Sequence, residues 1–473
     1  ANNPETGNAF VFRHVDPSAN SVVNGVLAEE IIREGTFENP LTTIAQAANV
    51  ADANADNIIF VQEGSAGGGF TLPEGVQVRS VGPVQQLDTQ FGEVILPGSG
   101  SGNLPTVTGQ VTIGNNTLVS GLEINPNKFD IGAEVDFGVV VALEPQVVNG
   151  IEANGENITL EDNVIANVDT GINLPDIDGT VTIVRNQISN TNDEGISFGD
   201  IADEDNATVT IADNTLETVD GNGIAFDFIE GNAIANITVA NNQITDTQVA
   251  GIFFDEIQGN AAATITVAGN IINAENGDAD EGIEFDRIEE NANATITVNE
   301  NQISNVGNSG NAGILFDDIQ EMATAVITIG GNTITDSGDD GIEFGFIENT
   351  TTSNITVSGN TITDIDANGI IIELIEDDAS ATVTVSDNTI TNPGGDGVSI
   401  EHTADANICL DLDNNTVTAP GGDGFNLLSN GAGQFQVVDL ANVTSRNVGT
   451  FNPADIETND SFVNGTAGQA PCL

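Results

Sequence analysis

The sequence has no tryptophan, no tyrosine and very little positive charge. Its 473 residues include seven lysines and arginines against 72 aspartates and glutamates. The formal charge of −65 makes nucleic acid and anionic membrane surfaces poor partners, because both repel a chain of this sign. No apolar run reaches the roughly 18 residues that a membrane-spanning helix requires, so we expect no membrane span.

Cysteine occurs only twice, at Cys409 in an expected strand and at Cys472 near the C-terminus. Two cysteines near one end of an otherwise cysteine-free chain suggest a disulfide that ties the tail to the repeats, as in an oxidising compartment. Two separate free thiols are the alternative. The chain begins Ala1-Asn-Asn-Pro, as a processed secretory product would. We therefore expect an extracellular, secreted or cell-surface location.

What the sequence does contain is a repeat. A β-rich run, an Asn, an Ile, a Gly/Asp turn and Gly-Ile-x-Phe recur about ten times, as in Thr264–Asn270 followed by Gly282–Phe285. Successive copies lie 23 to 31 residues apart. A fixed period of this size indicates a solenoid, in which each repeat buries its apolar face against its neighbours. The asparagines that align the copies are Asn163, Asn186, Asn214, Asn242, Asn270, Asn301, Asn332, Asn360, Asn388 and Asn415.

The local pattern predicts which solenoid this is. In each β-rich run, apolar and polar residues alternate, so that Ile265 and Val267 face one way and Thr264 and Thr266 the other. No repeat carries the 3.6-residue stripe of a helix, and short strands separated by Gly, Asn and Asp are typical of a parallel β-helix. Strands ~4.8 Å apart would let the asparagines hydrogen-bond in a ladder. Isoleucines and phenylalanines share further offsets: Ile244, Ile272, Ile303, Ile334, Ile362 and Ile390, and Phe198, Phe226, Phe254, Phe285, Phe316 and Phe344.

With these motifs, roughly residues 36–430 resemble the right-handed parallel β-helix proteins of the pectate-lyase-like superfamily. The segment 35–48 is similar to the start of secreted β-helix proteins, in which a short helix closes the end coil. Four of the apolar residues between positions 41 and 51 share one helical face: Leu41, Ile44, Ala48 and Ala51. The tail, with its Pro-Cys ending, resembles cyanobacterial surface β-helix proteins.

The predicted fold is therefore all-β, a right-handed parallel β-helix solenoid of about ten to twelve coils with an N-terminal capping helix and a C-terminal cap. We expect three parts along the chain. They are an N-terminal cap region with the short helix and first strands at 1–100, the repeats at 101–430, and a C-terminal cap tail at 431–473.

Acidic residues also fall into columns. One column follows the phenylalanines, and further acids stand in the turn before Gly-Ile. Two carboxylates ~4.8 Å apart repel by about 0.9 kcal/mol even in water, so such a column should bind cations or change its protonation. Oxygen ligands of this kind suit Ca²⁺, and a solvated acidic face that keeps the chain soluble is the alternative. The candidate Ca²⁺ ligands are Asp227, Asp255, Asp286 and Asp317 in the column, with Asp278, Asp280, Asp364 and Asp366 in the turns.

The sequence assigns no catalytic residue. The resemblance implies that a lyase would use a basic residue, and only Arg185 and Arg287 lie inside regular coils. Arg287 follows the acidic column without a Lys or His partner, which favours an ion pair over a lyase base. Epimerases of this fold use a tyrosine, which the chain lacks, and the His and Arg-x-Lys motifs of polygalacturonase-type hydrolases are missing. Pairs of acids for glycoside cleavage remain open, because carboxylates are abundant.

Two functions from different classes follow. The first is a non-enzymatic extracellular structural or adhesive protein (a surface, sheath, filament or matrix component) that self-associates or binds cell-surface polysaccharide. Uniform coil lengths favour it. The alternative is a polysaccharide lyase or glycoside hydrolase, for which segment 125–145 is the one place with room for a cleft-forming loop. A phage-type spike would need trimer-forming terminal segments, which the sequence does not reveal.

Overall fold

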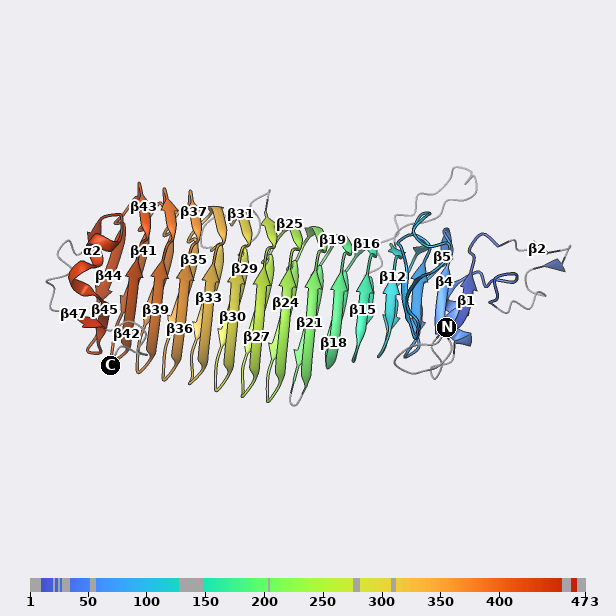
Figure 1. The fold of residues 1–473 in the computed structure, drawn as a ribbon, viewed down its shortest axis with the longest axis horizontal. Helices are drawn as coiled ribbons and strands as arrows, with labels where there is room; N and C mark the ends of the chain where they lie inside the picture. The colour runs from blue at the N-terminus through green and yellow to red at the C-terminus, as the bar shows by residue number, and fades with distance from the viewer. Residues whose placement is uncertain are drawn as a thin grey trace, which may run out of the picture. The chain divides into compact units, whose positions relative to one another are not determined.

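The chain is an all-β parallel β-solenoid of about ten turns (Figure 1). The computed structural model describes residues 10–19, 22–23, 26–27, 35–51, 57–126, 148–202, 205–274, 281–307, 312–452 and 461–465. The chain divides into two compact units, one of residues 1–197 with 213–215, the other of residues 198–212 with 216–473. The predicted fold class is confirmed, while the right-handed sense of the coil remains a prediction.

The strands of each unit belong to three parallel sheets, which we call A, B and C. In the first unit, sheet A contains β1 (Val11–Val15), β4 (Asn57–Val61), β7 (Gln77–Ser80), β12 (Leu118–Ser120), β15 (Ile158–Glu161) and β18 (Gly179–Val184). Sheet B contains β5 (Ser65–Gly67), β10 (Thr106–Val107), β13 (Glu123–Ile124), β16 (Val164–Val168) and β19 (Gln187–Thr191). Sheet C contains β6 (Phe70–Leu72), β11 (Val111–Ile113), β14 (Ile151–Ala153) and β17 (Ile172–Asp176).

The second unit repeats this arrangement, and strands that straddle the boundary are assigned to it. Sheet A contains β21 (Asn206–Ala212), β24 (Ile234–Ala240), β27 (Ala262–Ala268), β30 (Asn293–Asn299), β33 (Thr324–Gly330), β36 (Thr352–Ser358), β39 (Ser380–Ser386), β42 (Asn407–Asp413), β45 (Phe435–Val438) and β47 (Phe462–Gly465). Sheet B contains β22 (Thr215–Val219), β25 (Gln243–Thr247), β28 (Ile271–Asn273), β31 (Gln302–Val306), β34 (Thr333–Ser337), β37 (Thr361–Thr363), β40 (Thr389–Thr391) and β43 (Thr416–Thr418). Sheet C contains β20 (Ile196–Ile201), β23 (Ile224–Ile229), β26 (Ile252–Ile257), β29 (Ile283–Ile288), β32 (Ile314–Ile319), β35 (Ile342–Ile347), β38 (Ile370–Ile375), β41 (Val398–His402), β44 (Phe425–Ser429) and β46 (Phe451–Asn452).

Helix is scarce in the described chain. Helix α1 (Ile44–Val50) begins after Thr43, whose side chain accepts a hydrogen bond from the Gln46 N–H, and it contacts β1, β4, β5 and β6. Its buried residues are Ile44, Ala47 and Ala48, close to the predicted face. That α1 closes the end of the coil remains a prediction. Neither α1 nor α2 (Val443–Arg446) is long and apolar enough to cross a bilayer. Two antiparallel hairpins join β2 (Val22–Val23) to β3 (Val26–Leu27) and β8 (Gln86–Thr89) to β9 (Gly92–Ile95).

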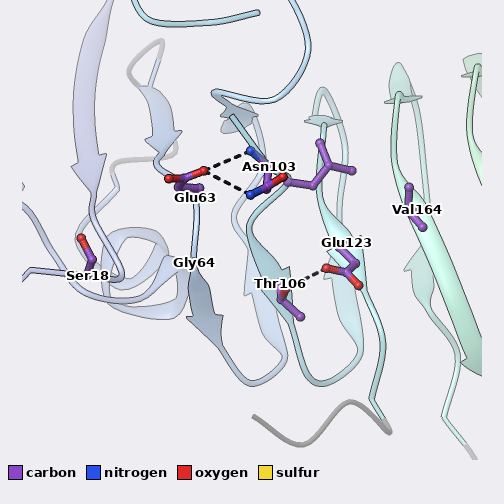
Figure 2. A pocket seen from close by; sticks show the side chains of 8 residues that line it. Ser18, Glu63, Gly64, Asn103, Thr106, Glu123 and Val164 are labelled. Atoms are coloured by element: carbon purple, nitrogen blue, oxygen red, sulfur yellow. Dashed lines mark hydrogen bonds between the residues drawn. The ribbon is translucent and has the colours of Figure 1, made fainter. Parts of the chain in front are cut away.

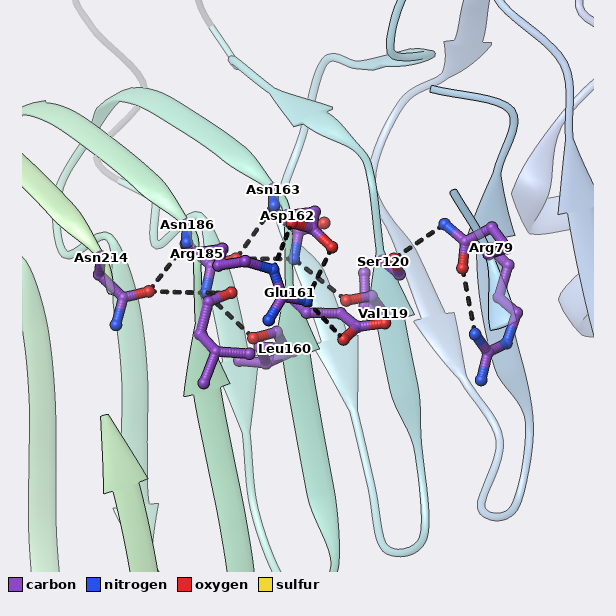
Figure 3. Close-up of polar contacts among 12 residues, drawn as sticks. Arg79, Val119, Ser120, Leu160, Glu161, Asp162, Asn163, Arg185, Asn186 and Asn214 are labelled. Atoms are coloured by element: carbon purple, nitrogen blue, oxygen red, sulfur yellow. Dashed lines mark hydrogen bonds and ion pairs between the residues drawn. The ribbon is translucent and has the colours of Figure 1, made fainter. Parts of the chain in front are cut away.

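The predicted asparagine ladder is present within each unit. In the first unit, the backbone N–H and Nδ2 of Asn163 both donate to Oδ1 of Asn186 at 3.0 Å, and Asn186 donates to Asn214 in the same way (Figure 3). In the second unit the same bonds connect every step from Asn242 to Asn415. Each Nδ2 also donates to a backbone carbonyl, so the buried amides are satisfied.

Two further columns pack the interior of the second unit. The six phenylalanines from Phe198 to Phe344 stack with ring centroids 4.4 to 5.1 Å apart. The glycine before each sheet C strand from β23 to β44 is required by the close approach of the next coil and not by its φ. A Cβ on Gly282 would lie 2.4 Å from the Gly313 carbonyl oxygen, and therefore only glycine lets successive coils meet here.

The tail departs from the repeat but continues the sheets. Strands β45 and β46 pair with β42 and β44, and β47 pairs with β45. Between them lie a 3₁₀ turn (Leu440–Asn442) and α2, after which Asn447 accepts two hydrogen bonds from Asn415. Cys409 is buried beside Val438. Its predicted partner Cys472 lies outside the described residues, so the disulfide remains a prediction.

Candidate active site on the outer face of sheet C

The outer face of sheet C in the second unit gathers most of the predicted acidic column. In β29 the buried residues are Ile283, Phe285 and Ile288, whereas Glu284, Asp286 and Arg287 are only partly buried. The neighbouring strands repeat this pattern in parallel register, with Phe285 beside Phe316 and Arg287 beside Asp318. We define the acidic face as the outward side chains of β26, β29, β32, β35 and β38 together with Asp339 and Asp340, which lie in the turn before β35.

Arg287 is the only basic residue among these strands, and it is held by three carboxylates. Its guanidinium lies 2.9 Å from Asp255 and 3.0 Å from Asp286, and it also pairs closely with Glu256. Burial, together with a hydrogen bond to Asp286, raises the pKa of Asp255 to about 6 although Arg287 opposes the shift. A guanidinium bound on three sides is poorly placed to take a substrate proton, and the predicted ion pair is confirmed.

Farther along the face the carboxylates have no such cation. Burial raises the pKa of Glu343 to about 8, and the charges of Asp340, Glu373, Asp339 and Asp317 add to the shift. Burial also raises the pKa of Asp340, which is 4% exposed, to about 6. The pKa of about 8 keeps Glu343 neutral at pH 7, whereas Asp340, with a pKa of about 6, is mostly ionised there. A neutral acid beside an ionised carboxylate is the condition for acid–base catalysis by two carboxyls.

The turn acids also have a structural use that the sequence did not reveal. The Asn368 backbone N–H donates to Asp340 at 2.5 Å, the Asp396 N–H donates to the Asn368 side chain at 2.8 Å, and the Asp423 N–H donates to Asp396 at 2.6 Å. A second side-chain ladder therefore runs along these turns. Asp364 similarly accepts from the Asn392 side chain at 2.9 Å.

The predicted Ca²⁺ ligands are only partly brought together. Asp255 and Asp286 lie on neighbouring strands but share Arg287, which already supplies a cation to that part of the column. Asp317 follows on the next strand, Asp227 lies on β23, and Asp364 and Asp366 lie in a turn. Asp278 and Asp280 fall outside the described residues. Within the described ranges, no three His, Cys, Asp or Glu side chains form a group that could hold a metal ion. Ca²⁺ binding remains a prediction.

The other basic residues of regular coils are engaged as well. Arg185 binds Asp162 at 2.8 Å and Glu161 at 2.9 Å, and its hydrogen bond to Asp162 raises its pKa further (Figure 3). His402 is fully buried, and its Nε2 lies 2.8 Å from the Ala406 carbonyl oxygen. Arg185, Arg287 and His402, three of the candidate bases of a lyase, are thus each held by partners.

The first unit has a separate open cavity of about 720 Å³ that the sequence did not indicate (Figure 2). Glu63 accepts hydrogen bonds from the backbone N–H of Asn103 at 3.1 Å and from its side chain at 3.5 Å. Thr106 donates to Glu123 at 2.8 Å. Both carboxylates are already bonded within the cavity wall. The predicted insertion at 125–145 lies almost wholly outside the described residues, and whether it forms a cleft remains a prediction.

No family model and no curated protein matches this chain. Among solved structures, it is similar to the catalytic unit of a thermostable GH87 α-1,3-glucanase from Streptomyces thermodiastaticus, with 16% identity over 81% of this chain and 66% of that chain and a TM-score of 0.45. The catalytic domain of a GH87 α-1,3-glucanase in complex with tetrasaccharides matches at 14% identity over 81% and 64%, with a TM-score of 0.39. A family 28 exopolygalacturonase from Yersinia enterocolitica matches at 12% identity over 89% and 78%, with a TM-score of 0.29. The chain thus spans just under two thirds of the two glucanase chains, and likenesses this weak do not decide its function.

Proposed function

We propose that the chain hydrolyses an uncharged polysaccharide on the acidic face, with Glu343 as the proton donor. The observation that carries this proposal is the raised pKa of Glu343, to about 8, beside several other carboxyls. A carboxyl that is still protonated at neutral pH can protonate the leaving oxygen of a glycosidic bond. Asp317 and Glu373 lie on the two strands that flank Glu343 and are the candidates for the ionised partner.

The charge of the face favours an uncharged substrate. Apart from Arg287, the strands of the face carry only acids as charged residues, and the whole chain has a formal charge of −65. Uronate or sulfate groups would be repelled from such a surface. A neutral glucan, by contrast, can approach and hydrogen-bond to the carboxyl groups.

The experiment measures reducing ends released from a panel of neutral glycans by the full chain. Once a substrate is found, Glu343→Gln is expected to lower kcat by about 10²–10⁴-fold, the usual contribution of a positioned proton donor. Glu217→Gln, which changes an exposed carboxyl on β22 of sheet B, is the control and should leave kcat unchanged. Release of no reducing ends from any neutral glycan, or full activity of Glu343→Gln, would contradict the proposal.

The second candidate is the non-enzymatic structural or adhesive role at an extracellular surface. The asparagine ladder of the second unit and the stacked phenylalanines from Phe198 to Phe344 favour it, because such regular coils build a stiff element. Electron microscopy and sedimentation with Ca²⁺ and with EDTA test it. A chain that lacks hydrolase activity but forms filaments or sheets, or binds intact polysaccharide, would support this role, whereas a monomer that does neither would contradict it.

A further inference from the structure

A second outer face of the same unit has the opposite chemistry. Seven strands of sheet A lie side by side from β21 to β39 (Figure 1). None of them contains Asp, Glu, Lys, Arg or His, in a chain that has 72 acidic residues. We call their outward side chains the threonine face.

The threonine face is a regular grid. One row has a threonine in every strand, and the parallel register keeps them level: Thr210, Thr238, Thr266, Thr297, Thr328, Thr356 and Thr384. A second row, two residues earlier, holds Thr208, Asn236, Thr264, Thr295, Val326, Asn354 and Thr382. Neighbours along a row are ~4.8 Å apart, and the two rows are about 6.6 Å apart.

The grid is pre-organised and its hydroxyls are available. Threonine is β-branched and has few rotamers, so little side-chain entropy is lost when the face binds something. Within the described residues, none of the seven hydroxyls of the complete row has a hydrogen-bond partner in the protein. Each threonine of the row carries a methyl as well as a hydroxyl group, and the neighbouring Ile234 and Val326 are 48% and 38% exposed.

The chemistry of the face narrows what could occupy it. The seven strands hold no charge to complement an ionic partner and no aromatic ring on which a sugar could stack. A second copy of the chain also has a formal charge of −65, so the two copies would repel each other. What remains is a periodic, uncharged surface that donates and accepts hydrogen bonds.

Ordered water meets these conditions. In a tetrahedral water network with O···O distances of about 2.75 Å, second neighbours lie about 4.5 Å apart. The difference from ~4.8 Å is about 0.3 Å at each step, so that it reaches about 0.9 Å over four strands and about 2 Å, nearly half of the lattice repeat, over all seven. The waters bound to threonines of three or four adjacent strands can therefore stay in register with such a lattice, whereas no single lattice row follows the whole face without a shift. We propose that the threonine face binds the surface of ice.

The test uses the full chain in a nanolitre osmometer, which measures thermal hysteresis and shows the shape of single ice crystals. The wild-type protein is expected to shape the crystals and to hold their growth below the melting point. Thr297→Lys, at the centre of the grid, should lower the hysteresis several-fold because it introduces a long, charged side chain. Thr333→Lys, at an exposed position of β34 in sheet B, is the matched control and should keep full hysteresis.

Melting temperatures of both variants establish that they fold, and Thr266→Lys in the adjacent coil replaces Thr297→Lys if that variant does not. Wild-type protein that neither shapes ice nor shows hysteresis at millimolar concentration overturns the proposal. Equal hysteresis in the face and control variants also overturns it. A change of oligomeric state in Thr297→Lys without a change in ice binding would make the face a contact between copies and would equally overturn it. None of these outcomes depends on glycan hydrolysis.

Discussion

In the second unit, the outward faces of sheets A and C belong to the same coils yet differ completely in charge. The six strands of sheet C from β23 to β38 contain nine acidic residues and one arginine, whereas the seven strands of sheet A from β21 to β39 contain no charged residue. Their inward rows are alike, since apart from Ser353 on β36 both consist of buried residues without a polar side chain. The repeat therefore constrains the interior, and each sheet is free to carry its own outward chemistry.

The difference also changes how neighbouring coils affect one another. On sheet C, burial raises the pKa of Asp255, Asp317 and Asp318, neighbouring carboxyls add to each shift, and Arg287 opposes it. On sheet A, stacked threonines add no electrostatic cost. Substitutions on the two faces should thus respond differently to pH and salt, while substitutions in the shared interior should not distinguish the faces.

The largest effect is expected in that shared interior. Asn301→Ala removes the acceptor of two Asn270 donors and the donor to Val267 and Asn332, and leaves buried groups unpaired. The free energy of unfolding should fall by about 3 kcal/mol or more, measured by urea denaturation. The control Asn236→Ala, at an exposed position of the threonine face, should stay within about 0.5 kcal/mol of the wild type. Equal losses would mean that the ladder does not stabilise the coils.

A smaller effect is expected when the acidic face loses its cation. Arg287→Met leaves Asp255, Glu256 and Asp286 facing one another, and the free energy of unfolding at pH 8 should fall by about 1–2 kcal/mol. The loss should shrink at pH 5, which is below the pKa of about 6 of Asp255, and in high salt, which screens the repulsion among the three carboxyls. Arg185→Met in the first unit should cost less, because the Arg185 side chain is 49% exposed and its ion pair with Asp162 is better solvated. A loss independent of both pH and salt would contradict the electrostatic cause.

The pH dependence of stability provides a third comparison. The folded-state pKa of Glu343 is about 8, above its ordinary value of 4.5, so the folded protein binds this proton more tightly than the unfolded chain does. The resulting stability is complete below about pH 4.5 and is lost as the pH rises through about 8. The melting temperature should therefore fall between pH 5 and pH 9, and Glu343→Gln should reduce that fall. An identical pH profile in the wild type and Glu343→Gln would rule out the shift.

The smallest effect is expected on the threonine face. Thr297→Val keeps the side-chain shape and removes a hydroxyl without a partner among the described residues. The free energy of unfolding should change by no more than about 0.5 kcal/mol, equally at pH 5 and pH 9. A pH-dependent change would mean that charges reach this face, contrary to the contrast between the two sheets.

The interior was predictable because the same residue type recurs at the same position of each repeat and has the same structural role there. The asparagine, isoleucine and phenylalanine columns all followed from the sequence period. Asn447 was missed because α2 intervenes between it and Asn415, so that no repeat motif marks it. The ladder of Asp340, Asn368, Asp396 and Asp423 was also missed, because sequence does not show which backbone N–H groups lie opposite these side chains.

The candidate active site was less accessible to sequence reasoning. The Asp column and Arg287 drew attention because they repeat, whereas Glu343 has Leu315 and Ile371 at its offset on the neighbouring strands. The raised pKa of Glu343 depends on burial and on acids from three coils. Which acids lie near Glu343 is set by the register of the strands, and the spacing of residues along the sequence does not show it. The alternation of polar and apolar residues at Thr264 to Val267 predicted an outward threonine row in one coil. That the outward side of seven neighbouring strands carries no charged residue became apparent only when the structure placed these strands side by side.

The asparagine ladder also bears on how such a chain can change its length. Each asparagine accepts from the coil before it and donates to the coil after it by the same bonds, so any two coils present compatible ends. Removal of residues 271–301 would bring Asn270 and Gln302 together and restore the same step. Whole coils are thus modular in a way that partial coils are not, and gene duplication or deletion in units of one coil can lengthen or shorten the protein while every buried amide stays satisfied.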